Sequence, residues 1–274
     1  MNSLSDEATI SSRVHTIADG APEHDRVDTV AVEAPLEIRI GLKPATVLMR
    51  TPGDDEELVR GFLFSEGIIG SVSEVIWMGR PPNLIGDQQG NVMAVQLAAR
   101  RQARSIDRNF YSSSSCGVCG KKTIASLEVK GTVSDSRWTI EQSVLATLPD
   151  QLRAAQQAFA KTGGVHASGL FTPQGELLEA REDVGRHNAL DKLIGWALKA
   201  GRIPLSDCVL LVSGRVSYEI VQKAVSASLP LIAAVGAPSS LAIELAERFN
   251  ITLIGFLRSD TMNVYANPAR VRRA

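Results

Sequence analysis

Two of the chain's three cysteines lie close together in a segment of serine and glycine. Residues 112–122 read SSSSCGVCGKK, so two residues separate Cys116 from Cys119, and two lysines follow. The thiolate is the nucleophilic form of cysteine, and a neighbouring cation such as Lys121 or Lys122 favours it. Serine and glycine have weak preferences for helix and strand, so we predict a mobile loop here.

A cysteine pair of this kind is compatible with four chemistries, two of which the sequence disfavours. A run of serine and glycine cannot easily enclose the pair as buried core residues. A structural zinc site needs four ligands, yet no second CxxC follows, and His166 and His187 would complete a site only by long-range accident. A zinc deaminase also needs His-x-Glu, whereas His166 is followed by Ala167 and Ser168. We therefore expect no bound zinc.

Two alternatives stay open for the pair. One is a dithiol redox protein, although a thioredoxin-like pair lies at a helix start and this one follows a serine run. The other is a sulfur carrier, in which the Cys116 thiolate attacks a donor persulfide, takes its terminal sulfur and delivers it elsewhere. Cys119 would then relay the sulfur or act as a resolving thiol. A mobile loop suits a carrier that must meet two partners in turn.

Four polar clusters fall at the predicted ends of strands and starts of helices in the second half of the chain. Their members are His166, Arg186, His187, Gly214, Arg215, Ser217, Arg258, Ser259, Asp260 and Thr261. In open α/β sheets, ligands bind beyond the carboxyl ends of the strands, and arginines and helix N-termini favour phosphate. Ordinary turn and capping chemistry explains any single cluster, but several together favour a phosphate-bearing ligand. The absence of a Walker loop and of GxGxxG disfavours ATP hydrolysis and NAD binding.

The elements that must position these clusters alternate along residues 123–274. The runs CVLLVSG, PLIAAVG and ITLIGFL predict buried strands, and VHASGLFT with ELLEARED predicts a hairpin. GRHNALDKLIGWALKAG, SYEIVQKAVSAS and SSLAIELAERFN predict helices, with Ser217 as an N-cap. Strands alternating with helices predict a largely parallel sheet covered on both faces, so we expect a three-layer α/β/α domain. Cys208, inside CVLLVSG, is predicted to be a core residue.

The rest of the chain divides into three predicted segments. Residues 1–27 are polar and acidic, which predicts a disordered or loosely docked tail. Residues 28–111 predict a small β-rich lobe with one helix, at whose start Asp54 and Glu57 have the spacing of a capping box. The mobile CxxC loop, residues 112–122, would lie between this lobe and the C-terminal domain.

Composition limits the classes of function. The 274 residues carry a net charge of −1 and 44% hydrophobic content, so the overall charge attracts neither nucleic acid nor an anionic membrane. No stretch approaches the roughly 18 apolar residues that span a bilayer, and MNSLSDEATISSRVHTIADG lacks the features of a secretory signal. An odd number of cysteines argues against a disulfide framework. We expect a cytoplasmic protein with no nucleic-acid or membrane partner.

In this order, the motifs SSSCGVCGK, HASGLF, EDVGRHNALDK, SGRVSYEIVQKA and FLR…NVY resemble those of the formate dehydrogenase accessory sulfurtransferase family, FdhD. The resemblance runs from about residue 28 to the C-terminus. It implies that the C-terminal domain has a cytidine deaminase-like fold without the zinc catalytic set.

The resemblance also implies a function. Members accept sulfur from a cysteine desulfurase and transfer it to a bis(molybdopterin guanine dinucleotide) cofactor of molybdenum or tungsten, which formate dehydrogenase requires. Cys116 matches the persulfide carrier. The segment implicated in cofactor binding corresponds to Phe256, Leu257, Arg258, Ser259, Asp260 and Thr261. On this basis we expect GDP-like nucleotides to mimic part of the ligand, the desulfurase and the formate dehydrogenase catalytic subunit to be partners, and the protein to be a homodimer.

Overall fold

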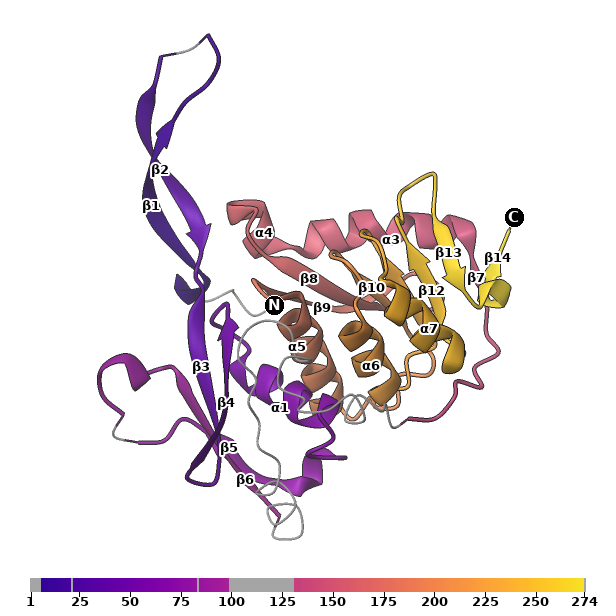
Figure 1. Cartoon of the computed structure of the whole chain (residues 1–274), viewed down its shortest axis with the longest axis horizontal. Helices are drawn as coiled ribbons and strands as arrows, with labels where there is room; N and C mark the ends of the chain where they lie inside the picture. Colours follow the sequence, from indigo (N-terminus) through magenta and orange to yellow (C-terminus); the bar gives the residue numbers. More distant parts are fainter. Residues whose placement is uncertain (1–5, 21, 83, 99–130, 274) are drawn as a thin grey trace.

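The structure, a computed structural model, describes residues 6–20, 22–82, 84–98 and 131–273 (Figure 1). The predicted CxxC loop, with Cys116 and Cys119, lies outside the described residues. Among the residues that are described, none of the helices has the length and apolar content that a membrane span needs. Short 3-10 helices occur at Asp6–Ala8, Val72–Glu74, Gly86–Gln88 and Pro268–Arg270.

A two-stranded hairpin projects from the body of the protein (Figure 1). It consists of β1 (Thr9–Thr16) and β2 (His24–Ala31), paired antiparallel. The predicted disordered tail over residues 1–27 therefore does not hold for these strands. Most side chains of the hairpin are exposed, so its sequence has no strong alternation of apolar residues from which strands could be predicted. Cross-strand pairs such as His15 and Asp25, whose side chains are 2.8 Å apart, stabilise it instead.

The N-terminal lobe is a four-stranded sheet with one helix packed on it. The strand order is β4 (Lys43–Arg50), β3 (Ala34–Ile40), β6 (Val92–Leu97) and β5 (Val75–Gly79). Helix α1 (Asp55–Ser65) follows β4 along the chain. The capping box predicted at its start is not formed, because Asp54 has a left-handed φ of 54° and its side chain makes no cap hydrogen bond.

The C-terminal part is built on a six-stranded sheet with the order β13-β12-β11-β10-β8-β9. Its strands are β8 (His166–Phe171), β9 (Leu177–Asp183), β10 (Val209–Val212), β11 (Leu231–Ala234), β12 (Thr252–Gly255) and β13 (Asn263–Ala266). Strands β10, β11 and β12 are parallel, whereas β8, β9 and β13 run antiparallel to their neighbours. The sheet is therefore mixed rather than largely parallel, because β8 and β9 form the predicted hairpin and β13 returns beside β12.

Helices cover both faces of this sheet (Figure 1). On one face, α5 (Arg186–Lys199), α6 (Tyr218–Ser226) and α7 (Ser240–Arg248) pack against alternate strand residues in one hydrophobic cluster. On the other face, the strand residues between them pack against α3 (Gln142–Ala155) in a second cluster. Helix α4 (Gln157–Thr162) and a small sheet of β7 (Ile140–Glu141) and β14 (Val271–Arg272) complete the fold. The protein is thus of the α/β class.

The two parts of the chain meet where α1 crosses α5. A Cβ added at Gly61 of α1 would overlap the carbonyl of Asp191, and one added at Gly195 of α5 would overlap the carbonyl of Glu57. Glycine at both positions lets the two backbones touch. Residues of both sheets and of α1, α5 and α6 belong to one buried cluster, so the lobe and the larger domain share a core.

Candidate functional site

The loops that follow β10, β11 and β12 lie side by side at the carboxyl edge of the sheet. The N–H of Phe256 donates to the carbonyl of Gly236 over 3.1 Å. A Cβ at Gly236 would lie 2.8 Å from the carbonyl oxygen of Gly214, so glycine is needed for this approach. We call this surface the carboxyl-edge site, made up of His166, Arg186, His187, Gly214, Arg215, Ser217, Phe256, Arg258, Ser259, Asp260 and Thr261.

The imidazole of His166 lies between the start of α5 and the loop after β10. A Cβ at Gly214 would lie 3.3 Å from Nδ1 of His166 and 3.6 Å from Cδ of Arg186, so both side chains face this glycine. Burial lowers the pKa of His166, and the charge of Arg186 lowers it further. Asp183 opposes this effect, and Arg215 adds to it. Burial and the two arginines therefore both disfavour the protonated form of the ring.

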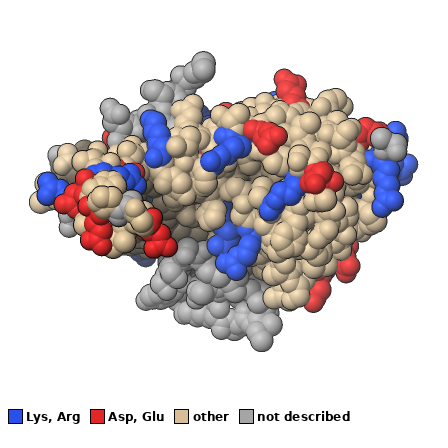
Figure 2. All heavy atoms as spheres, turned by 90° about the horizontal axis from the view of Figure 1, so that it is seen from above, with Lys and Arg blue, Asp and Glu red and all other residues tan. Residues whose placement is uncertain are grey.

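Arginine side chains give the site its charge. The Nε of Arg186 is buried, and within the described part of the chain nothing accepts its hydrogen. Arg215 and Arg258 are exposed, and Arg258 anchors its loop by donating from Nη1 to the carbonyl of Val235 at 2.9 Å. Figure 2 looks onto this end of the molecule and shows Lys and Arg at several points of its central surface, while the projection at the left carries both acidic and basic side chains. A buried donor without an acceptor favours an anionic ligand here.

The start of α5 is held by the carboxylate of Asp183. Its Oδ1 accepts from the N–H of Gly185 at 2.8 Å and from the amide of Asn188 at 3.0 Å. Its Oδ2 accepts from the N–H of Thr51 at 3.1 Å and lies 2.9 Å from Nζ of the buried Lys192. These contacts place the α5 N-terminus, and with it Arg186, at the edge of the sheet.

His187 and Ser217 meet directly behind the surface. The Nε2 of His187 lies 3.0 Å from Oγ of Ser217, and the ring is buried. Ser217 is the N-cap residue of α6, but its hydroxyl makes no cap hydrogen bond because it faces His187 instead. His187 also lies 3.6 Å from Glu219, which in turn lies 3.7 Å from Lys223. The two residues thus link the site to a buried polar network.

The segment after β12 divides between surface and core. Phe256 is 43% exposed and has a left-handed φ of 52°, a conformation that is costly for an aromatic residue. Ser259, Asp260 and Thr261 are exposed, and the N–H of Arg258 donates to the carbonyl of Thr261 at 2.8 Å. The side chain of Leu257 is 0% exposed and packs in the core, so its predicted role in ligand binding is not supported.

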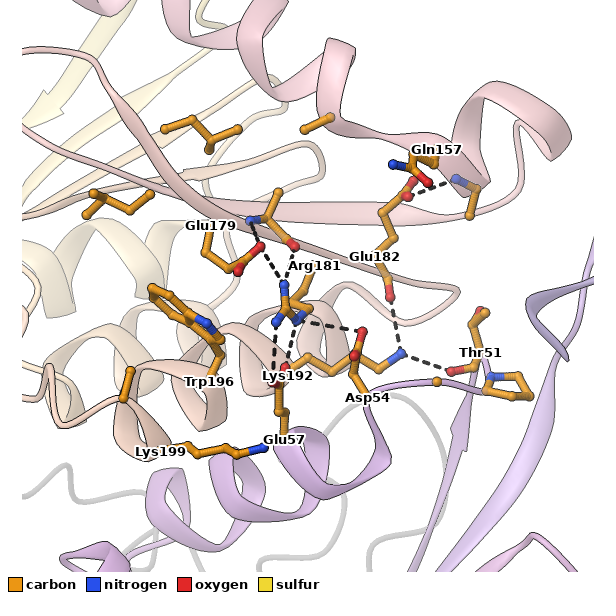
Figure 3. A pocket seen from close by; sticks show the side chains of 18 residues that line it. Thr51, Asp54, Glu57, Gln157, Glu179, Arg181, Glu182, Lys192, Trp196 and Lys199 are labelled. Carbon is orange, nitrogen blue, oxygen red and sulfur yellow. Dashed lines mark hydrogen bonds and ion pairs between the residues drawn. The ribbon is translucent and has the colours of Figure 1, made fainter. Parts of the chain in front are cut away.

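A cavity of about 1070 Å³ lies elsewhere, between the start of α1 and strand β9 with helix α5 (Figure 3). Of the predicted site residues that the structure describes, none lines it. Nε of Arg181 donates to Glu57 at 2.7 Å and lies 3.6 Å from Asp54. Nζ of Lys192 donates to the carbonyl of Thr51 at 2.9 Å. Many of the charged groups that line the cavity therefore already form ion pairs or hydrogen bonds at the junction between the lobe and the larger domain.

Sequence reasoning missed this junction because its partners are distant along the chain. Glu57 and Arg181 are 124 positions apart, and the local spacing assigned Glu57 to a capping box. By contrast, the carboxyl-edge site brings together polar clusters that the sequence placed at element ends. Within the described residues, no group of three His, Cys, Asp or Glu side chains could hold a metal ion. The chemistry that the described site supports is recognition of an anion.

Comparisons with known proteins agree on one family. The model of the FdhD/NarQ family matches residues 31–272. The chain is similar to the "Sulfur carrier protein FdhD" of Streptomyces avermitilis, with 51% identity over 94% of both chains, and to that of Mycobacterium tuberculosis, with 50% identity over 90% of this chain and 92% of the relative. Its fold is similar to that of a putative formate dehydrogenase accessory protein from Desulfotalea psychrophila, with a TM-score of 0.77, 25% identity and coverage of 97% and 100%.

Proposed function

Because this chain belongs to the FdhD/NarQ family, we propose that it is a sulfur carrier that serves a formate dehydrogenase. It accepts sulfur from a cysteine desulfurase and transfers it to a bis(molybdopterin guanine dinucleotide) cofactor. The relatives of 51% and 50% identity that are named as sulfur carriers support the sulfur-carrier role. The accessory protein of similar fold supports the link to formate dehydrogenase.

The observation that carries the ligand part of the proposal is the buried Nε of Arg186, which has no acceptor among the described residues. Together with exposed Arg215 and Arg258, it provides guanidinium donors of the kind that bind phosphates. The molybdenum cofactor is the substrate here, and its guanine dinucleotide carries the phosphates that these residues would bind. Exposed Phe256 would offer an aromatic face to the base.

Cys116 would carry the sulfur between donor and substrate. Its thiolate attacks the terminal sulfur of the donor persulfide, the sulfur–sulfur bond of the donor breaks, and the donor leaves as a thiolate. Delivery to the cofactor as sulfide needs two electrons: attack of the Cys119 thiolate on Sγ of Cys116 would release the outer sulfur as sulfide and leave a Cys116–Cys119 disulfide, which a dithiol reductant would then reopen. Cys119 would relay the sulfur or resolve a disulfide. This assignment rests on the sequence motif alone, since both cysteines lie outside the described residues.

A persulfide assay tests the proposal. The protein would be incubated with a cysteine desulfurase and cysteine, and the peptide containing Cys116 would be analysed by mass spectrometry. We expect a mass increase of one sulfur atom, its loss on reduction, and no increase in Cys116→Ala. If Cys116→Ala still accepts sulfur and still activates formate dehydrogenase, the carrier assignment is wrong.

The alternative is a dithiol redox protein, or a chaperone that binds the cofactor without transferring sulfur. It predicts that Cys116→Ala retains both cofactor binding and activation of formate dehydrogenase. We also infer a cytidine deaminase-like class for the larger domain, supported by the mixed sheet with helices on both faces. A cytoplasmic homodimer that contacts the desulfurase and the formate dehydrogenase catalytic subunit completes the proposal.

A further inference from the structure

We propose that His166 is a further binding residue of the carboxyl-edge site, and that its imidazole takes up a proton from solvent when a phosphate-bearing ligand binds. The protonated ring then donates a hydrogen bond to the phosphate. This inference rests on the proposed function, because it requires an anionic ligand at this site. It adds to that function a residue that senses whether the phosphate is bound.

The position of His166 supports this role. The ring is half-buried at the start of β8, beside the backbone of Gly214 and on the same side as Arg186. A Cβ at Gly214 would lie 3.3 Å from Nδ1 and 3.4 Å from Cε1 of the ring, so any larger residue there would crowd it. The neighbouring Nε of Arg186 is the buried donor that has no acceptor in the described structure. A phosphate that satisfies Arg186 would therefore lie close to the imidazole.

The charges that face His166 come from three elements. Arg186 projects from α5, Arg215 from the loop after β10, and Asp183 from the end of β9, opposite His166 in the strand pair. Asp183 is already engaged by Gly185, Asn188, Thr51 and Lys192. The guanidinium groups of Arg186 and Arg215 therefore disfavour protonation of the ring. Asp183 favours it, but its charge is already balanced by its other contacts. Burial, followed by this balance of charges, lowers the pKa of His166 and so favours the neutral imidazole while the site holds no anion.

An arriving phosphate reverses this balance. Burial, followed by Arg186, lowers the pKa of free His166 below its ordinary value of 6.5. A phosphate places negative charge beside the ring and engages the arginines, both of which favour the imidazolium. The bound state then holds more protons than the free state. By linkage, the affinity for the ligand must rise as the pH falls through the neutral range.

GDP is the probe for the test, and calorimetry is the measurement. Titration of the full chain in two buffers of different ionisation enthalpy gives the number of protons taken up on binding. We expect uptake by the unmodified protein at pH 7 and a clearly smaller uptake by His166→Asn, which keeps a hydrogen-bond donor but cannot titrate. At pH 6 the variant should bind GDP about tenfold more weakly, and at pH 8 the two affinities should converge.

The matched control is His24→Asn, an exposed residue at the start of β2 in the hairpin that projects from the body of the protein (Figure 1). It should keep both the proton uptake and the pH profile of the unmodified protein. The ionisation of free GDP is the same for every variant, so the variants differ only in the protons held by the ring and by the bound phosphate beside it. Carbon-13 spectra of the His166 ring, recorded with and without GDP across pH, measure the same shift without any substitution and so cover a variant that fails to fold.

Proton uptake by His166→Asn equal to that of the unmodified protein would overturn the inference, and so would an unshifted titration of the ring. Failure of the unmodified protein to bind GDP would overturn it as well. None of these results concerns Cys116, whose role is decided by the persulfide assay. The role of His166 and the carrier role of Cys116 can therefore fail separately.

Discussion

Asp191 of α5 and Lys223 of α6 form a salt bridge of 2.8 Å between side chains that are only 3% and 2% exposed. Oγ of Ser65, the last residue of α1, donates to the same carboxylate at 2.9 Å. Burial alone would lower the pKa of Lys223, but the carboxylates of Asp191 and Glu219 outweigh it and raise that pKa. The ammonium therefore stays charged in the core and joins α1, α5 and α6.

Replacement of Lys223 by methionine should strongly destabilise the protein. The substitution leaves the buried carboxylates of Asp191 and Glu219 without this cation, and breaking a buried pair in this way costs about 3–5 kcal/mol. Urea unfolding followed by circular dichroism measures the loss. Lys199→Met, at an exposed position of the neighbouring α5, is the control and should leave the midpoint almost unchanged. Equal midpoints for the two variants would contradict the role given to the pair.

The cost of Lys223→Met should depend on pH. Burial raises the pKa of Asp191 to about 6 even with Lys223 beside it, and loss of the lysine, which lowers that pKa, raises it further. A carboxyl group whose pKa is raised in the folded state stabilises that state most at low pH, and this stabilisation is lost as the pH rises. The free energies of unfolding of the variant and the unmodified protein should therefore differ least near pH 5 and most at pH 8. Unfolding curves at both pH values check this, and a constant difference would count against it.

Gly61→Ala should separate α1 from α5. The added Cβ would overlap the backbone carbonyl of Asp191, which cannot move aside as a flexible side chain could. Overpacking of this kind costs about 1–3 kcal/mol in stability, which outweighs the gain from the higher helix propensity of alanine compared with glycine. The control is Gly164→Ala, where a Cβ would meet Ala31 at an ordinary 3.5 Å. Thermal melting should show a clear loss only for Gly61→Ala.

Cys208 should not react in the folded protein. It is 1% exposed, and burial, with a contribution from Asp207, raises the pKa of its thiol to about 12. Alkylation requires an accessible thiolate. After brief treatment with iodoacetamide at pH 8, mass spectrometry should find Cys208 unmodified in native protein and modified in urea. Rapid labelling of native Cys208 would show that a second nucleophile competes with Cys116 in the persulfide assay.

Arg258→Ala should weaken GDP binding about tenfold, the usual effect of losing one charged hydrogen bond. Its guanidinium is exposed at the carboxyl-edge site and also anchors the loop by donating to Val235. Isothermal titration measures the affinity. The control, Arg137→Ala, removes the same charge beside Trp138, whose Nε1 donates to Ser206 at the opposite edge of the sheet. Unchanged affinity in Arg258→Ala would remove this residue from the site.

The sequence predicted best those elements that are buried on a regular period. Strands β10, β11 and β12 and helices α5, α6 and α7 appear where apolar runs and amphipathic stripes place them. The hairpin of β1 and β2 escaped prediction because its side chains are largely exposed and leave no apolar period. Local spacing also misled at Glu57, whose carboxylate binds Arg181 of β9 rather than the helix start.

The sequence predicted those parts of the site that follow from polar residues in turns and at the starts of helices. Polar residues after neighbouring strands converge because the topology brings those strand ends together, and Arg186 and Arg215 accordingly lie near His166. Burial of individual side chains cannot be deduced from a motif. Leu257 lies inside the predicted binding segment, yet its side chain packs in the core after a bend at Phe256, whose φ is left-handed. His187 was predicted in the polar cluster at the start of a helix, and its ring is buried there against the hydroxyl of Ser217.

The crossing of α1 and α5 has a consequence for the synthesis of the protein. Ser65 and Asp191, which meet there, are 126 positions apart in the chain. A ribosome adds about 5–20 residues per second, so the apolar side of α1 emerges roughly 6–25 s before the helix that covers it. During that interval the nascent lobe exposes a surface that later becomes core. Expression of this protein should therefore depend on chaperones that act at the ribosome.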